Sequence, residues 1–189
     1  MGSRSCYVGA EMGGYKGRIQ ARGDVLNRGD GPLLSRARSM PKDLIPVYLE
    51  ETLLRAVEGP QSDYFDRGLQ TFFESEFSVS PHANRMGYRL DGPPILHKEG
   101  VAKSIISEPS LPGGVQVTPD GQPIILLVEQ TVGGYTKIAT LVSSDISRVA
   151  QTKPGDRIRF EKTDLEKAHI IYRQQRELQD KIKARLEAI

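Results

Sequence analysis

The sequence offers little for metal, disulfide or nucleotide chemistry. Cys6 is its one cysteine, so no internal disulfide can form. The three histidines, His82, His97 and His169, are scattered without an HxH or HxxxH spacing, which argues against a zinc-type site. A glycine-rich phosphate loop ending in Lys-Ser or Lys-Thr is also missing. We therefore expect no metal and no directly bound cofactor, and ATP used in the pathway would bind another chain.

Other function classes are disfavoured on the same grounds. No apolar run reaches the length of a membrane span, and no arginine-rich block with interleaved aromatics indicates nucleic-acid binding. The net charge is only +2, and the polar, glycine-rich start does not resemble a signal peptide. Serines such as Ser107 and Ser143 lack a GxSxG context, so a self-contained hydrolase is not favoured. We expect a cytoplasmic globular protein with 38% hydrophobic residues to form its core.

Short β-rich segments separated by turn residues fill the middle of the chain. Val115 and Val117 alternate with Gln116, and Ile158 with Arg157 and Arg159, which is the period of a half-buried strand. Turns such as Pro-Gly-Gly and Pro-Asp-Gly separate the segments. This regular spacing predicts a mainly β fold, a mostly antiparallel, closed or nearly closed barrel. The expected strands are 53–57, 76–79, 103–107, 115–118, 124–128, 138–142 and 157–161, with short helices at 68–75 and 145–151.

The C-terminus is predicted to be one long helix over 163–189. Thr163 and Glu166 have the spacing of a capping box, in which each side chain bonds a free backbone amide. The helix should dock its apolar stripe on its own barrel, or else on a partner chain. The stripe consists of Leu165, Ala168, Ile171, Leu178, Ile182, Leu186 and Ile189.

A polar cluster over residues 129–137 directly follows the apolar run 123–128. Physical reasoning leaves two interpretations open: a binding site, or a wide hairpin turn with a hydrogen-bonded tyrosine. In the first, side chains at several strand ends converge on one barrel mouth that suits a small amide or carboxylate substrate. An arginine fork would bind the carboxylate, and a lysine would stabilise a carbonyl oxygen that develops negative charge. The candidates are Lys137, Tyr135 and Glu129 as catalytic residues, and Arg85, Arg89, Gln116, Gln130, Thr131, Gly133 and Gly134 as substrate-binding residues.

Each candidate also has a structural alternative. Arg85 and Arg89 could form ion pairs with Asp91 or Glu129. Gln116 could be an exposed strand residue, Tyr135 a packing aromatic, and Lys137 a surface lysine. Near these candidates, Asp120 is expected to shape the Pro-Asp-Gly turn. The alternatives stay open at the level of the sequence.

Five segments in order, 59–61, 84–92, 115–123, 129–137 and 150–156, resemble the allophanate hydrolase subunit 2 family, also called the biotin-dependent carboxyltransferase family. The resemblance implies a cyclophilin-like barrel over 51–162, after a glycine-rich segment, 1–50, from the middle of the family's subunit. The resemblance also implies a further family portion before Met1, so we expect the chain to be a shortened form of the family's subunit. Glu129 stands where the family usually has Asp, Thr118 where it has Pro, and Cys6 where it has Thr.

The resemblance implies a subunit that works with a sister cyclophilin-like chain, and in one branch with a third chain. That branch opens 5-oxoproline to glutamate with ATP, and it is the function expected here, with activity only in the complex. A second branch transfers a carboxyl group from biotin to urea. In a third, a non-catalytic member binds the inhibitor of a sporulation histidine kinase. We also expect a homo-oligomer, associating near residues 1–39 with help from the stripe over 171–189.

Overall fold

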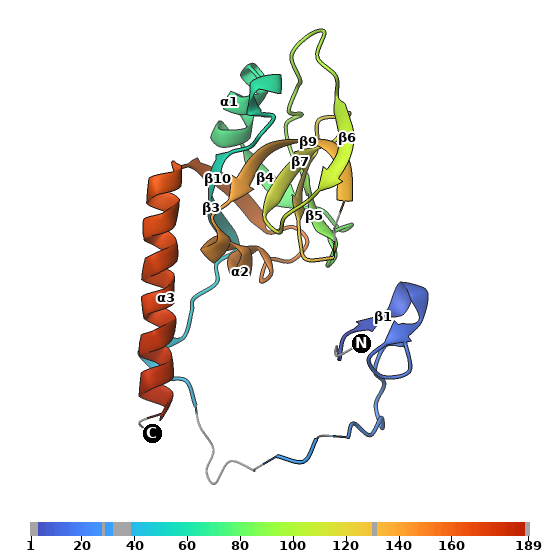
Figure 1. The fold of residues 1–189 in the computed structure, drawn as a ribbon, viewed down its shortest axis with the longest axis vertical. Helices are drawn as coiled ribbons and strands as arrows, with labels where there is room; N and C mark the ends of the chain where they lie inside the picture. Colours follow the sequence, from blue (N-terminus) through green and yellow to red (C-terminus); the bar gives the residue numbers. More distant parts are fainter. Residues whose placement is uncertain (1–3, 28, 32–38, 130–131, 188–189) are drawn as a thin grey trace. The chain divides into compact units, whose positions relative to one another are not determined.

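The computed structural model describes residues 4–27, 29–31, 39–129 and 132–187 (Figure 1). It divides into two units, Met1–Arg38 and Ser39–Ile189. No helix in the described ranges is both long and apolar enough to cross a membrane.

In the described part of the N-terminal unit, turns and the ion pair of Arg18 with Asp24 hold the chain, and no residue belongs to the hydrophobic core. A two-stranded hairpin joins β1 (Cys6–Tyr7) to β2 (Met12–Gly13), with η1 (Val8–Ala10) between them. Arg18 donates two hydrogen bonds of 2.8 and 2.6 Å to the carboxylate of Asp24. These bonds, with one from a backbone N–H, lower the pKa of Asp24 to about 2.

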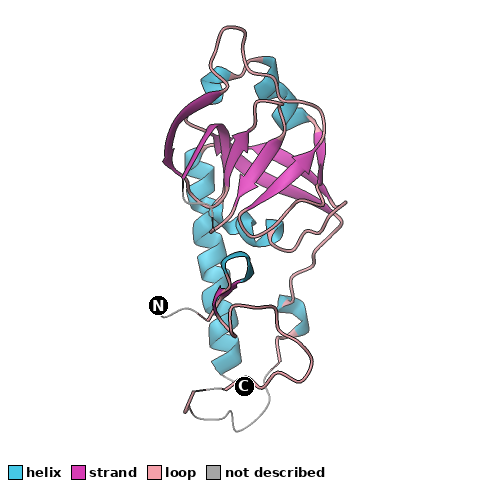
Figure 2. Ribbon diagram, turned by 90° about the vertical axis from the view of Figure 1, so that its right-hand side faces the viewer, coloured by secondary structure: helices cyan, strands magenta, loops and turns pink. Residues whose placement is uncertain are grey.

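The second unit is built around a closed barrel of seven strands in the order β3-β10-β4-β5-β8-β7-β9, in which β9 pairs back to β3 (Figures 1 and 2). All neighbouring pairs are antiparallel except β3 with β10. An eighth strand, β6, pairs with the first part of β9 outside the ring. The strands are β3 (Glu51–Glu58), β4 (Glu76–Val79), β5 (Gly87–Asp91), β6 (Ser104–Pro109), β7 (Gly114–Val117), β8 (Pro123–Leu126), β9 (Val132–Leu141) and β10 (Arg157–Lys162).

Alternate strand residues point into the barrel and form one core. Val115, Ile125 and Ile158 are fully buried, and each has polar or pocket-lining neighbours on the other face. The core is closed by α1 (Arg67–Glu74), whose Phe72 stacks on Phe160 with ring centroids 4.1 Å apart. Burying one side chain of this size stabilises the fold by roughly 1.5–3 kcal/mol. η3 (Ser62–Tyr64) precedes α1.

A partly buried ion pair between Arg55 and Asp145 attaches η4 (Ser143–Asp145) and α2 (Ile146–Val149) to the barrel. Asp145 is 1% exposed and accepts hydrogen bonds from the backbone N–H and the guanidinium of Arg55, at 2.9, 2.8 and 2.5 Å. The hydrogen bond to Asp145 raises the pKa of Arg55. Arg148 of α2 donates to the carbonyl of Leu53 on the same strand. These bonds fix the loop after β9 against β3.

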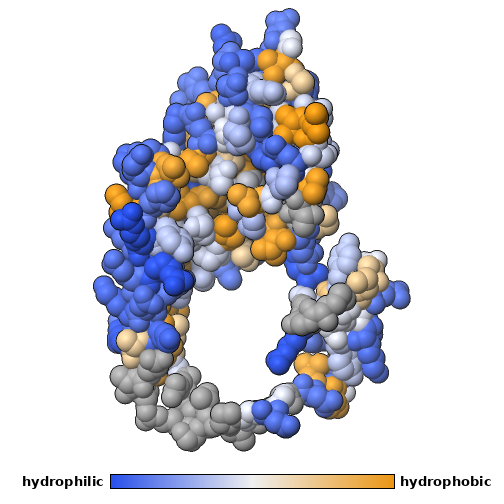
Figure 3. Space-filling model, viewed as in Figure 1, coloured by the Kyte–Doolittle hydropathy of each residue, from blue (hydrophilic) through white to orange (hydrophobic). Residues whose placement is uncertain are grey.

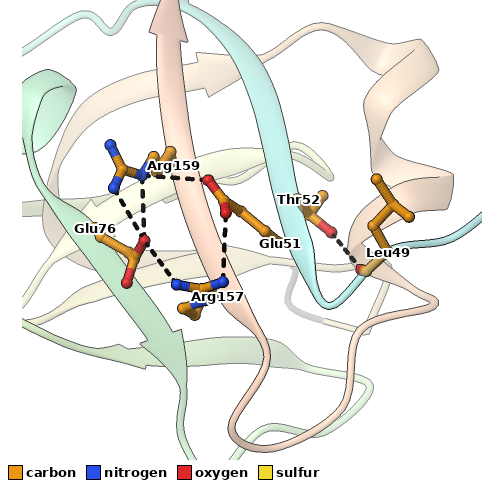
Figure 4. A network of polar contacts seen from close by, with 6 residues as sticks. All are labelled: Leu49, Glu51, Thr52, Glu76, Arg157 and Arg159. Carbon is orange, nitrogen blue, oxygen red and sulfur yellow. Dashed lines mark hydrogen bonds and ion pairs between the residues drawn. The ribbon is translucent and has the colours of Figure 1, made fainter.

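On the outer face of β3, β10 and β4, charged side chains form a ladder (Figure 4). Arg157 and Arg159 of β10 each pair with Glu51 of β3 and Glu76 of β4, at 3.1 to 3.7 Å. All four side chains are substantially exposed to solvent, so each pair contributes about 0–1 kcal/mol.

The long helix α3 (Leu165–Glu187) confirms the predicted C-terminal helix, but its cap lies one residue later than expected. The carboxylate of Asp164 accepts the N–H of Lys167 at 2.7 Å, while the N–H of Thr163 donates to Ala56 on β3. The predicted capping box at Thr163 is therefore wrong, because the backbone N–H of Thr163 is hydrogen-bonded to strand β3 of the barrel.

The helix contacts its own unit beside the barrel, but none of its described residues is fully buried, so the expected docking of the whole stripe on the barrel is not seen. α3 contacts η4, and Ile171 and Ile182 line a groove of about 550 Å³ with residues 43–48, which include part of η2 (Lys42–Leu44). Arg185 pairs with Asp43 at 2.5 Å. Leu165 and Leu178 of the stripe remain exposed.

The main architecture was predicted from the sequence. Every expected strand overlaps an observed one, and the expected helices overlap α1 and α2. The prediction did not name β5 as a strand. Its five residues, Gly-Tyr-Arg-Leu-Asp, place only two apolar side chains, Tyr88 and Leu90, toward the core. That is too short a pattern to identify from periodicity alone.

Candidate functional site

A pocket of about 190 Å³ lies on the outer face of the barrel wall formed by β5, β8, β7 and β9. Register pairs Arg89 with Ile124, Ile124 with Gln116, and Gln116 with Lys137, so these side chains share one face. Their sequence neighbours Leu90, Ile125 and Val115 fill the core on the other face. The lining residues are His82, Asn84, Met86, Gly87, Arg89, Gln116, Ile124, Leu126 and Tyr135.

This position corrects the expected barrel mouth. Arg89, Gln116 and Tyr135 do come together, but through the middle of four neighbouring strands and not at strand ends. The physical reason is the two-residue period of a strand. Polar residues that alternate with core residues must point outward through the wall, wherever the strand ends.

Gln116 forms the floor of the pocket. Its residue is 2% exposed, and its Nε2 has no hydrogen-bond partner among the described residues. Leaving a buried amide donor without a partner costs about 1–3 kcal/mol, a cost that a bound acceptor would remove. The sequence alternative of an exposed strand residue is therefore wrong for Gln116.

Gly133 makes room for that amide. A Cβ at Gly133 would lie 2.6 Å from Nε2 of Gln116, closer than any real contact. Gly133, expected as a substrate-binding residue, thus lies against Gln116. Gly134 faces the carbonyl of Ile105 and the hydroxyl of Ser107, where a Cβ would meet them at 3.1 and 3.2 Å. The two glycines let β9 approach Gln116 on one side and β6 on the other.

Arg89 on β5 and Tyr135 on β9 line the pocket from the two outermost of these four strands. Arg89 has no ion-pair partner within 4.0 Å in the described part of the chain, in contrast to the arginines of the ladder. Its charge helps to lower the pKa of Asp120, although the hydrogen bond from Thr118 is the main cause. That bond shapes the turn after β7, as predicted for Asp120. Tyr135 is 37% exposed at the rim.

Three further candidates are held elsewhere. The ammonium of Lys137 pairs with Glu108 at 2.7 Å and donates to the carbonyl of Pro109 at 3.0 Å, so it ties β9 to β6. Arg85 pairs with Glu129 at 3.2 Å, the structural alternative expected for that arginine. None of Lys137, Arg85 and Glu129 lines the pocket. Gln130 and Thr131 lie outside the described residues.

The loop between β4 and β5 adds residues that sequence reasoning missed. His82, Asn84 and Met86 all line the pocket. The side-chain oxygen of Asn84 accepts the N–H of Met86 at 2.8 Å, so the side-chain NH₂ of Asn84 is not used in this bond and can donate to another group. The segment 84–92 carried part of the family resemblance, and this was the available signal for Asn84 and Met86. His82 was set aside only because it had no metal-binding spacing.

The polar lining can donate hydrogen bonds to a ligand rich in acceptors. Gln116, Arg89, Asn84, His82 and Tyr135 all carry N–H or O–H groups, and no carboxylate is among the described lining residues. No group of three potential metal ligands gathers in the described ranges. His97 lies elsewhere, bonded to Thr136 at 2.8 Å, with its pKa lowered chiefly by burial. The pocket therefore suits a small oxyanion or carbonyl compound.

Known proteins are similar to this chain in sequence and in fold. The chain is 38% identical over 170 residues to the C subunit of 5-oxoprolinase from Escherichia coli (strain K12), and 32% identical over 170 residues to that of Haemophilus influenzae. Each match covers 89% of this chain and 53% of the relative, so the chain spans about half the length of these curated relatives. The crystal structure of the Kluyveromyces lactis urea amidolyase superposes with a TM-score of 0.80 at 26% identity, over 96% of this chain and 12% of that one.

A family profile also matches most of the chain. The family profile described as carboxyltransferase domain, subdomain A and B, matches residues 1–162, which include all the described strands and every lining residue of the pocket. The chain therefore belongs to the family of carboxyltransferase domains with subdomains A and B.

Proposed function

We propose that the chain is a subunit of an ATP-dependent complex of the 5-oxoprolinase type, and that the outer-wall pocket binds 5-oxoproline. The observation that carries this proposal is the buried amide of Gln116 beside the guanidinium of Arg89, both without a partner among the described residues. 5-Oxoproline offers both of the acceptors that these groups lack. Its carboxylate fits the arginine fork, and its lactam carbonyl can accept from Nε2 of Gln116. The similarity to the C subunit of 5-oxoprolinase supports the same assignment.

In this proposal the residues of the chain bind, orient and polarise the substrate. Attack on the lactam carbonyl places negative charge on its oxygen, and a fixed donor at that oxygen stabilises the charge more than it stabilises the ground state. Gln116 is such a donor, held in place by Gly133 and the surrounding strands. Activation by ATP is assigned to a partner chain, because the sequence has no phosphate-binding loop.

Reconstitution tests the proposal. The chain would be combined with the sister cyclophilin-like subunit and the third subunit of a 5-oxoprolinase, and glutamate release from 5-oxoproline would be measured with and without ATP. We expect product only when all chains and ATP are present, and a large loss with Arg89→Ala. A reaction mixture that turns over equally well without this chain would contradict the proposal.

Biotin-dependent carboxyl transfer is the second candidate, favoured by the structural similarity to a urea amidolyase. The pocket fits a ureido group in one respect, because the orphaned Nε2 of Gln116 can donate to a ureido carbonyl. Gln116 and Asn84 would then hold the ring, and biotin, when bound, would supply the transferable carboxyl group. Turnover of urea that depends on a biotinylated partner, with no glutamate release from 5-oxoproline, would select this candidate.

A further inference from the structure

Strand β9 contains one extra residue beside the pocket. Val115 of β7 pairs with Ala139 of β9. The next residue of β7, Gln116, pairs with Lys137, so Ile138 is an extra residue on β9. An extra residue of this kind is a β-bulge, and it shifts the alternation of side chains along its strand by one position. Bulges are common beside active sites, where they change the direction in which a side chain points.

The burial pattern of β9 records this shift. Ala139 and Leu141 are buried after the bulge, and Thr136 and Ile138 are buried before it. If the alternation ran back unbroken from Leu141, position 135 would share the core-facing side of the strand. The bulge instead places Tyr135 on the outer face, where it lines the pocket. Hydropathy alone does not identify this face, because hydrophobic residues lie among hydrophilic ones on the barrel surface in Figure 3.

The loop after β3 holds the bulge along the edge of β9 that pairs with β3. The N–H of Gly59 donates to the carbonyl of Ile138 at 2.8 Å, and the N–H of Gln61 donates to the carbonyl of Lys137 at 3.2 Å. The side-chain oxygen of Gln61 accepts the backbone N–H of Lys137 at 3.0 Å. A Cβ at Gly59 would lie 2.4 Å from the carbonyl oxygen of Lys137, so glycine permits this close approach. Gln61 therefore bonds both backbone polar groups of the residue next to the bulge.

We propose that Gln61 is a positioning residue of the pocket, whose side-chain amide fixes the bulge of β9 and keeps Gly133 and Tyr135 on the outer face. This inference rests on the proposed function, in that the pocket is the reacting site. Gln61 is not among the described lining residues, so it acts through the backbone of β9. A strand that lost the bulge, or moved it by one residue, would turn Gly133 and Tyr135 away from Gln116.

Substitutions at Gln61 separate its acceptor from its bulk. Gln61→Leu removes the acceptor, whereas Gln61→Glu keeps an oxygen acceptor at the same place in the side chain. Gln70→Leu is the matched control, because Gln70 is exposed on α1 and its amide bonds Glu74 of the same helix. Circular dichroism checks that each variant is folded. If Gln61→Leu does not fold, Gln61→Asn, which keeps the amide but shortens its reach by one methylene, takes its place with the same expectations.

NMR of the chain reads the position of β9 without substrate or ATP. A Cβ at Gly133 would lie 2.6 Å from Nε2 of Gln116, so the α-protons of Gly133 should show a nuclear Overhauser effect to the side-chain NH₂ of Gln116. Gln61→Leu should abolish this effect, because the bulge loses the acceptor that holds it. Gln61→Glu and Gln70→Leu should both retain it.

Turnover of the reconstituted complex links this position to the reaction. Gln61→Leu should lower kcat about tenfold with a smaller change in KM, because a displaced donor loses its stabilisation of the transition state above all. Gln61→Glu should recover most of the kcat, and Gln70→Leu should match the parent chain.

The proposal is overturned if Gln61→Leu keeps the Overhauser effect, or if it loses the effect without losing kcat. It is also overturned if Gln61→Glu is as impaired as Gln61→Leu, or if Gln70→Leu gives equal losses. A parent complex that releases no glutamate, together with an Overhauser effect that depends on the acceptor at position 61, would refute the proposed function and leave the positioning of β9 by Gln61 standing.

Discussion

Polar side chains on two outer faces of the same barrel differ in whether they have interaction partners within the chain. Over β3, β10 and β4, each arginine of the ladder lies between two carboxylates (Figure 4). Over β5, β8, β7 and β9, Arg89 has no ion-pair partner in the described residues, and Gln116 buries an unpartnered amide. Both faces follow from the same strand alternation, so secondary structure does not distinguish them. The difference lies in whether the polar groups find partners within the chain, and unsatisfied groups in a concave site indicate a ligand.

The substitution Gln116→Leu should have the largest effect on turnover, and it tests directly whether the unpartnered amide serves a ligand. If the amide serves a ligand, its loss should lower turnover about 100-fold, the effect of removing one oxyanion donor. The free energy of unfolding should hold or rise, because an unpartnered buried polar group is replaced by an apolar one of similar size. Steady-state kinetics of the reconstituted complex and urea denaturation measure the two effects. Lower stability with unchanged turnover would show that Gln116 is structural.

Gly133→Ala should have a smaller effect of the same kind. The added Cβ would displace the flexible end of Gln116 from its position, 2.6 Å away. We expect turnover to fall about tenfold with little change in the unfolding midpoint, because a displaced donor loses part of its stabilisation of the transition state. Gln116→Asn in the same chain shortens the side chain and should relieve the clash. Equal turnover for Gly133→Ala and the parent chain would separate Gly133 from the site.

The substitution Lys137→Met tests whether Lys137 has a structural role or a catalytic one. The lysine side chain is 11% exposed and its ammonium is paired with Glu108, so it acts as a link between β9 and β6. Its replacement should lower the free energy of unfolding by about 1–2 kcal/mol. Hydrogen exchange at β6 should rise. A loss of turnover as large as that of Gln116→Leu, without faster exchange at β6, would instead return Lys137 to the catalytic role predicted from the sequence.

The ladder should give the smallest response. Arg159→Ala removes two exposed pairs, each contributing about 0–1 kcal/mol, and should leave the turnover of the complex unchanged. The stability difference should shrink further in high salt, because exposed pairs are screened. Thermal melts at low and high salt measure this. A loss of turnover would show that this face also serves function.

Much of the fold could be predicted because its signals are local. The alternation around Val115 and Ile158 identifies strands and their buried faces, and it correctly placed Gln116 on the face away from Val115. What could not be predicted depends on tertiary pairing. The strand order that brings Arg89 beside Ile124 and Gln116 is set by barrel closure, and therefore the pocket was expected at a mouth instead of on a wall.

Two other misses have the same origin. The helix cap is Asp164 and not the predicted Thr163. The backbone N–H of Thr163 instead donates to the carbonyl of Ala56 on β3, the parallel neighbour of β10. Lys137 does not line the pocket, because its ammonium pairs with Glu108 of β6. β6 follows a long connection from β5 and pairs with β9. In both cases a partner that is distant in sequence decides the outcome, and local propensity carries no information about it.

The proposed contact between Gln116 and its ligand can be observed through the side-chain NH₂ signal of Gln116 in ¹⁵N-resolved NMR, followed as 5-oxoproline is added. We expect a saturable shift of this signal that is lost in Arg89→Ala and unaffected in Arg159→Ala. A Gln116 signal that stays fixed while 5-oxoproline shifts resonances elsewhere on the barrel would show that the outer-wall pocket is not the substrate site.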